Sequence, residues 1–160
     1  EAFHSKFNHL RWNQSKQIFT RWCEGKTGFP IVDAGMRQLK ETGWMHNRVR
    51  MIAASLLVKT LHLPWQWGEK YFAQTLIDYD PAVNNGNWQW VASTGADAQP
   101  YFRIFNPTLQ SKKFDPDGEY IKEYVPELRD CDPTKIHEPR NPIVDHRTQS
   151  QKALLLYKRK

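Results

Sequence analysis

The feature that most constrains the fold is a nearly continuous run of apolar residues within positions 47–61. A segment of this length that is apolar around most of its circumference predicts a central, buried helix. Its first turn carries Asn47, Arg48 and Arg50, and Pro64 follows as a stop. Strand signals are weak throughout the chain. We therefore expect an all-α domain, built as a helical bundle.

Further helices are predicted from apolar residues at helical spacing that are bounded by glycine or proline. They span residues 15–24, 31–42 and 67–77. After Phe105 the chain changes character, because Asn-Pro, Asp-Pro and Glu-Pro pairs recur along it. We expect that part to be irregular, with a short helix at 118–124 and a last helix that starts at Lys152 and ends in a basic, solvated tail.

The composition narrows the classes of function. A net charge of +6 over 160 residues favours an anionic partner, nucleic acid first, although simple solubility would also explain it. Two cysteines are too few for a disulfide framework and indicate a reduced protein of the cytosol or nucleus. No apolar run is long enough to span a bilayer, so no membrane partner is expected.

Spacing argues against three common catalytic arrangements. Gly25-Lys-Thr27 is similar to the end of a phosphate-binding loop, but Thr20 stands where that loop requires its first glycine. The six histidines have no metal-ligand spacing, so we expect no metal site. No Gly-x-Ser-x-Gly nucleophile motif occurs in the sequence.

Tryptophans alternate with acidic and amide residues in the middle of the chain. The motifs are Trp65-Gln-Trp67, Asp78-Tyr-Asp80 and Asn84-Asn-Gly-Asn-Trp88-Gln-Trp90. Indole stacks on flat ligands and can lose one electron, while carboxylates and amides bind N–H groups. The combination predicts a site for a flat, polar, redox-active ligand. The alternative interpretation is a capped turn, rich in amide donors, that holds no ligand.

Arg48 and Arg50 are two residues apart, so they point to different sides of the predicted helix. One can contact a phosphate, and the other can turn inward to pair with Asp78 or Asp80. The alternative is a surface helix start with two solvated arginines.

Five motifs agree in order and spacing with one protein family. They are Glu24-Gly-Lys-Thr-Gly-Phe-Pro30, Trp44-Met-His-Asn-Arg-Val-Arg50, Leu76-Ile-Asp-Tyr-Asp80, Asn84-Asn-Gly-Asn-Trp-Gln-Trp90 and Tyr101-Phe-Arg-Ile-Phe-Asn-Pro107. Together they resemble the C-terminal helical FAD-binding domain of the photolyase/cryptochrome family, over a core of residues 12–138 with a C-terminal extension at 139–160. The Asn84 to Trp90 pattern is most similar to the class I cyclobutane pyrimidine dimer (deoxyribodipyrimidine) photolyases.

The resemblance implies a role for each matching position. The electron-transfer chain is matched by Trp88 nearest the flavin, then Trp65, then Trp12 at the surface. Asn84 matches the residue beside the reactive N5 of the flavin, and Arg50 matches an arginine that pairs with Asp78. The cofactor-binding positions implied in this way are Arg50, Asp78, Tyr79, Asp80 and Asn84.

A second set of positions matches the family's contacts to DNA. Trp90 matches one of two aromatic walls around a flipped pyrimidine dimer, and Arg103 matches a phosphate-contacting arginine. The full set implied by the resemblance is Asn47, Arg48, Met51, Trp90 and Arg103.

The implied function is light-dependent DNA repair. FAD-mediated electron transfer would split cyclobutane pyrimidine dimers in UV-damaged DNA, which is a carbon–carbon lyase reaction. A cryptochrome-like blue-light photoreceptor and a flavin-free helical DNA-binding module are the alternatives. We expect a monomer that acts in the bacterial or archaeal cytoplasm, at the nucleoid, or in the nucleus.

Family members carry an N-terminal α/β antenna domain and an early part of the FAD-binding domain that this sequence does not show. That early part holds the FAD phosphates, the second aromatic wall and an acidic residue that contacts the dimer. We therefore expect the 160 residues alone to bind FAD weakly or not at all.

Overall fold

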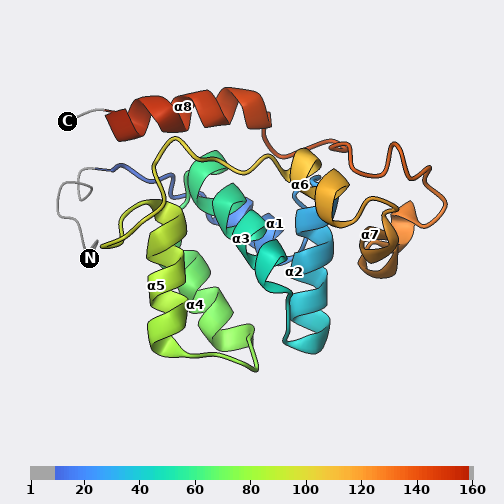
Figure 1. Ribbon diagram of the computed structural model, residues 1–160, viewed down its shortest axis with the longest axis horizontal. Helices are drawn as coiled ribbons and strands as arrows, with labels where there is room; N and C mark the ends of the chain where they lie inside the picture. Colours follow the sequence, from blue (N-terminus) through green and yellow to red (C-terminus); the bar gives the residue numbers. More distant parts are fainter. Residues whose placement is uncertain (1–9, 159–160) are drawn as a thin grey trace.

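The computed structural model describes residues 10–158, and every regular element in that range is helical (Figure 1). The expected all-α architecture is therefore confirmed. The elements are α1 (Lys16–Cys23), α2 (Pro30–Thr42), α3 (Asn47–Ser55), η2 (Leu56–Thr60), α4 (Trp65–Thr75), α5 (Pro81–Ala92), α6 (Pro107–Phe114), α7 (Glu119–Tyr124), η3 (Pro126–Leu128) and α8 (His146–Lys158).

Local sequence signals set the ends of the first two helices, as predicted. The hydroxyl of Ser15 accepts a hydrogen bond from the backbone N–H of Ile18 and so caps α1. Pro30 occupies the first position of α2, where its missing N–H costs nothing. Gly43 ends that helix in the left-handed region at φ 72°, a conformation that glycine adopts without strain.

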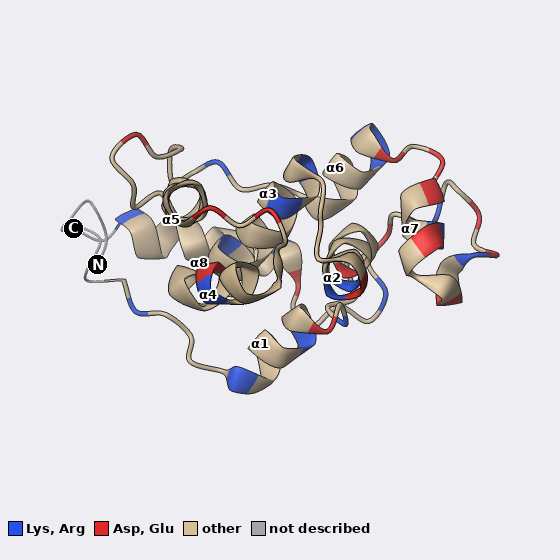
Figure 2. Ribbon diagram, turned by 90° about the horizontal axis from the view of Figure 1, so that it is seen from below, with Lys and Arg blue, Asp and Glu red and all other residues tan. Residues whose placement is uncertain are grey.

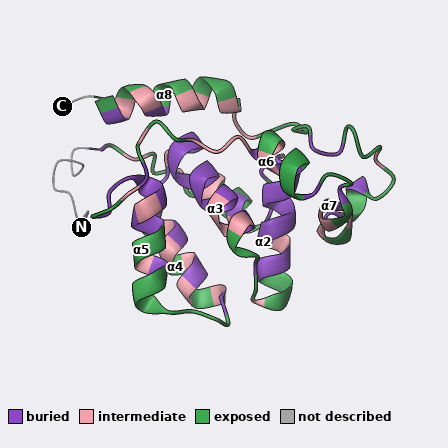
Figure 3. Cartoon of the chain, viewed as in Figure 1, coloured by how far each residue is buried: buried purple, intermediate pink, exposed green. Residues whose placement is uncertain are grey.

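The core forms where α2 and α3 pack together with η2 (Figure 3). The predicted helix at 47–61 was wrong in one respect, because its second half is a π-helical turn, η2. There the backbone N–H of Leu61 donates to the carbonyl of Leu56, five residues back. All five residues of η2 are buried, including Lys59. The central position predicted for this segment is confirmed.

The amide motif lies in a helix, α5, which follows the acidic motif directly and corrects the predicted turn around Asn84. Asp80 caps α5 by accepting a hydrogen bond from the backbone N–H of Val83, and Pro81 takes the first position. The helix then continues through the amide-rich stretch to Ala92. Helix α4 begins at Trp65, two residues before the predicted start, directly after Pro64. In Figure 1, α4 and α5 lie side by side.

The C-terminal part is more regular than expected. Asn106 caps α6, which was not predicted, by accepting from the backbone N–H of Leu109. The last helix begins at His146 instead of Lys152, because Asp145 accepts from the backbone N–H of Thr148 and starts it early. This helix, α8, runs across one face of the bundle and packs on η2 (Figure 1). The last two residues of the predicted basic tail lie outside the described residues.

None of the helices within residues 10–158 combines the length and apolar character needed to cross a membrane. Nor do three His, Cys, Asp or Glu side chains in that range converge to hold a metal ion.

Candidate functional site

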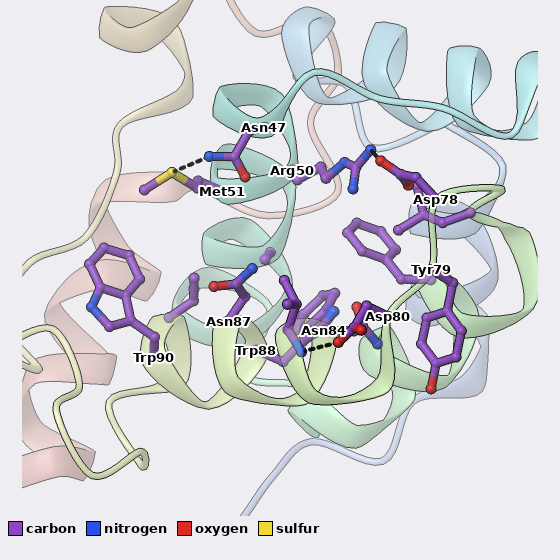
Figure 4. Close-up of a pocket in the computed structure, with 15 residues that line it drawn as sticks. Asn47, Arg50, Met51, Asp78, Tyr79, Asp80, Asn84, Asn87, Trp88 and Trp90 are labelled. Atoms are coloured by element: carbon purple, nitrogen blue, oxygen red, sulfur yellow. Dashed lines mark hydrogen bonds and ion pairs between the residues drawn. The ribbon is translucent and has the colours of Figure 1, made fainter.

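A cavity of about 370 Å³ opens between α3, α4 and α5 (Figure 4). This volume lies in the range of small-molecule sites. Apolar side chains line much of it, and polar groups stand among them. The lining residues are Asn47, Arg50, Met51, Ala54, Phe72, Leu76, Asp78, Tyr79, Asp80, Val83, Asn84, Asn87, Trp88, Trp90 and Val91.

Asn84 presents a fixed amide to this cavity. It is 8% exposed, and its Nδ2 donates a hydrogen bond of 3.0 Å to the backbone carbonyl of Glu69 on α4. A carbonyl can only accept, so this contact settles which end of the amide is nitrogen. The carbonyl oxygen of the Asn84 side chain is thereby the end available to an N–H group of a ligand. Asn85, the next residue, donates to the Glu69 carboxylate at 2.7 Å and secures α5 against α4.

Arg50 and Asp78 form an ion pair at one side of the cavity. Nη2 of Arg50 lies 2.8 Å from a carboxylate oxygen of Asp78, and its Nε donates to the backbone carbonyl of Met45. The side chains are 22% and 45% exposed, so solvent weakens the attraction to about 1 kcal/mol or less. The pair joins α3 to the α4–α5 loop. The ion pair fixes the orientation of the Arg50 guanidinium beside the cavity.

Tyr79 and Asp80 lie at the solvent-exposed margin of the cavity (Figure 4). Asp80 caps α5, which is what the alternative interpretation of the acidic pair anticipated. It also lines the cavity, so the capping role and the predicted ligand-facing position coincide.

Trp88 forms a buried wall of the cavity and is held on three sides. Its ring lies 5.0 Å from the Phe72 ring and 6.2 Å from the Trp22 ring, both in edge-to-face geometry. Gly68 on α4 faces the third side, where a β-carbon would stand 2.2 Å from the Trp88 ring. Trp88 is only 2% exposed, so its position leaves little freedom.

The other two tryptophans of the expected electron-transfer chain are placed less directly. Trp65 lies three residues before Gly68 on α4 and so shares the helix side that meets Trp88. Trp12 is partly buried and packs against the core. The ring contacts that the structure shows for Trp88 are with Trp22 and Phe72, not with these two residues.

Sequence reasoning missed Trp22 and the lining residues Phe72 and Asn87. Trp22 is fully buried and donates its indole N–H to the carbonyl of Ala53 at 3.1 Å. In the sequence it was one of several apolar residues on the predicted helix 15–24, a pattern typical of the core. Phe72 and Leu76 are four residues apart and face the cavity together, a spacing that would have indicated a shared helix side.

The residues expected to contact DNA divide into two groups. Asn47, Met51 and Trp90 line the same cavity as the cofactor set. Arg48 and Arg103 do not line it. Arg103 is exposed on the segment after α5, and Arg48 lies on the first turn of α3, immediately after Asn47.

The fold and the cavity define a class of protein: an all-helical domain with a cavity lined by aromatic rings and oriented amides. The chain belongs to the family described as the FAD binding domain of DNA photolyase, whose family profile matches residues 1–159. The family resemblance of the five motifs is therefore confirmed.

Relatives and solved structures agree with this membership. The chain is 55% identical to a deoxyribodipyrimidine photo-lyase of Vibrio cholerae over 93% of its length, and 52% identical to that of Escherichia coli over 94%. It spans 34% of each of these relatives.

Solved structures of whole photolyases contain the same fold. A bacterial class III photolyase from Agrobacterium tumefaciens matches with a TM-score of 0.93 and 47% identity, covering 98% of this chain and 36% of that one. An archaeal photolyase from Sulfolobus tokodaii, solved with two FAD molecules, matches with a TM-score of 0.93 and 45% identity, covering 100% and 39%. A Synechocystis cryptochrome matches with a TM-score of 0.88 and 35% identity, covering 92% and 34%. The more specific assignment to class I stays a prediction.

Proposed function

We propose that the chain supplies one half of the flavin and substrate site of a photolyase that repairs cyclobutane pyrimidine dimers in UV-damaged DNA. One observation carries this proposal: the cofactor set and three of the five DNA-contact residues line a single cavity. A lesion bound there would lie against the flavin site, as electron transfer requires. Such an enzyme acts where the DNA is, in the bacterial or archaeal cytoplasm or in the nucleus.

The lining residues fit a flavin. Phe72, Leu76 and Trp88 provide apolar surface for a flat ring, while the Asn84 oxygen is available to accept from a ring N–H. Arg50, held by Asp78, places a positive charge where it would stabilise negative charge on a ligand. Reduced flavin would supply the electron that breaks the bonds of the dimer.

Asn47, Met51 and Trp90 form the substrate side of the site. A pyrimidine dimer stacks poorly in a duplex, so extruding it costs less than extruding a normal base. Trp90 offers an aromatic wall for the extruded dimer, and each base–aromatic contact contributes about 1–3 kcal/mol. Asn47 adds an amide that can reach the edge of the bases.

A light-dependent repair assay tests the proposal with the full-length gene product. The substrate is a duplex with one cyclobutane thymine dimer, and the flavin is chemically reduced beforehand. We expect the dimer to disappear in blue light and to persist in the dark. Trp90→Ala should weaken binding of the damaged duplex by about 5- to 150-fold. The control Trp44→Ala removes a 42% exposed tryptophan that does not line the cavity, and it should leave binding unchanged. An illuminated enzyme that leaves the dimer intact contradicts repair and favours the photoreceptor.

We also propose that Trp88, Trp65 and Trp12 carry electrons from the surface to the flavin, with Trp88 as the first donor. Its burial against the cavity supports this order. Trp88→Phe keeps an aromatic ring that is far harder to oxidise. The variant should fail to photoreduce oxidised flavin, while enzyme reduced beforehand still repairs dimers. Unimpaired photoreduction in absorbance measurements would remove Trp88 from the chain of donors.

A further inference from the structure

Two cations, one on α3 and one on α6, have no acidic partner among the described residues. Arg48 and Lys113 form no ion pair within residues 10–158, although their neighbours do. Arg50 pairs with Asp78, and Lys112 pairs with Glu138 at 2.7 Å. Within the described residues, α3 and α6 therefore each carry one cation in an ion pair and one cation, Arg48 or Lys113, without an ion pair. Figure 2 shows basic residues on both helices, whereas acidic residues gather around α7.

The ring of Phe114 holds these two cations. The guanidinium carbon of Arg48 lies 4.7 Å from the centroid of the ring, and Nζ of Lys113 lies 5.3 Å from it. Both distances are within the range of attraction between a cation and the face of an aromatic ring. Phe114 is the last residue of α6 and is 46% exposed. A phenyl ring that is this exposed contributes little to the core. Core packing therefore does not explain why the ring lies against two cations.

Arg48 occupies a position where a helix disfavours positive charge. It is the second residue of α3, and no acidic residue stands in that first turn. The N-terminal end of a helix carries partial positive charge, which repels a cation and would drive the flexible side chain away. The Phe114 ring opposes this repulsion and keeps the guanidinium at the end of α6, while the preceding residue, Asn47, lines the cavity. Stability alone would favour an acidic residue at this position.

We propose that Phe114 is a positioning residue for DNA binding, which orients Arg48 and Lys113 toward backbone phosphates flanking the lesion. This inference rests on the proposed function. Long cationic side chains normally lose rotational freedom when they bind a phosphate, and a ring that restrains them beforehand reduces that loss. Phosphate contacts fix the register of a protein on a duplex without reading the bases. Phe114 therefore affects damaged and undamaged duplexes alike.

The test measures binding by fluorescence anisotropy in the dark, with the full-length gene product and labelled duplexes with and without one thymine dimer. Phe114→Leu keeps an apolar side chain but removes the aromatic face. It should weaken binding of both duplexes by about two- to fivefold, the range expected for an exposed cation–aromatic contact. Phe114→Tyr keeps the face and should bind like the wild type. Leu155→Ala on α8, where leucine is 61% exposed, is the matched surface control.

A second set of variants separates positioning from a structural role. Arg48→Gln should reduce the slope of log affinity against log salt by about one, the loss of one phosphate contact. With Arg48→Gln and Lys113→Gln already present, Phe114→Leu should have no further effect. The inference is overturned if that effect persists, if Phe114→Tyr fails to restore binding, or if only the damaged duplex is affected. If the wild type prefers the damaged duplex and every Phe114 variant binds with the same affinity as the wild type, only the positioning role is rejected and the proposed function stands. A wild type without preference for the damaged duplex rejects the proposed function.

Discussion

Alanine at Gly68 should destabilise the protein, whereas alanine at Gly86 should stabilise it, although both glycines lie inside helices. A β-carbon at Gly68 would stand 2.2, 2.5 and 2.7 Å from three atoms of the Trp88 ring. That ring can retreat only by losing its packing against Phe72 and Trp22. A β-carbon at Gly86 would meet open space. The two substitutions therefore share their chemistry and differ in what surrounds them.

The magnitude follows from two terms. Replacing glycine by alanine in a helix favours folding by about 1 kcal/mol at either position, so this term cancels between the variants. Overpacking a tight contact costs about 1–3 kcal/mol, and it applies at Gly68 alone. The free energy of unfolding of Gly68→Ala should accordingly be lower than that of Gly86→Ala by about 1–3 kcal/mol.

Urea unfolding of the full-length gene product, followed by circular dichroism, measures this difference. Gly68→Ala should also slow photoreduction of the flavin, because Trp88 must move to admit the new methyl group. The reasoning is refuted if Gly68→Ala proves as stable as Gly86→Ala. In that case α4 and α5 would separate without cost, and the tight contact would not fix Trp88.

Two further predictions concern buried and capping charges. Burial lowers the pKa of Lys59 from its ordinary 10.5 to about 7, although its Nζ donates to the Ser93 hydroxyl at 2.7 Å and lies 4.0 Å from the Tyr157 ring. Between those two pH values the unfolded chain binds more protons than the folded protein, so the wild type should gain stability relative to Lys59→Met as the pH rises from 7 toward 10.5. The gain in unfolding free energy is at most about 1.4 kcal/mol per pH unit, and thermal unfolding scans at several pH values measure it. A difference between the two proteins that does not change with pH would contradict this. Asp80→Ala removes the cap of α5 and should cost about 1 kcal/mol of unfolding free energy, while Asp80→Asn, which keeps an acceptor for the Val83 N–H, should cost less.

The bounds of α1 and α2 depend on neighbouring residues and could be predicted from the sequence, whereas the equally local caps of α6 and α8, at Asn106 and Asp145, were missed. Ser15 and Gly43 act within their own turns, so the bounds of α1 and α2 follow from local chemistry. The π-helical turn η2 could not be predicted, because its register depends on what packs around it. Lys59 illustrates the reason: its ammonium group is satisfied by Ser93 and by the backbone carbonyl of Tyr101, both distant in sequence.

The candidate site divides in the same way. The motifs and the family resemblance identified residues whose chemistry is unusual for a core, such as Asn84 and Asp78. Trp22 was missed because a tryptophan at helical spacing is indistinguishable from a core residue until its neighbours are known. Its contact with Trp88 spans two helices that are far apart in the sequence. Phe114 was missed for a similar reason, since its contact with Arg48 joins α6 to α3.

The composition of α5 shows how the site overrides local preference. Asparagine and glycine are poor helix formers, yet four of them follow one another from Asn84 to Asn87. Asn84 and Asn87 line the cavity, and Asn85 accepts from Gln89 while donating to Glu69. A contact with another residue or a position at the cavity therefore explains the three asparagines of this stretch. Gly86 has neither, and open space surrounds it. A segment that contradicts its own propensity is expected where function selects the residues. This stretch is therefore a helix that is stabilised by its ends and by α4 and that presents amides to the cavity, and not the turn that its composition indicates.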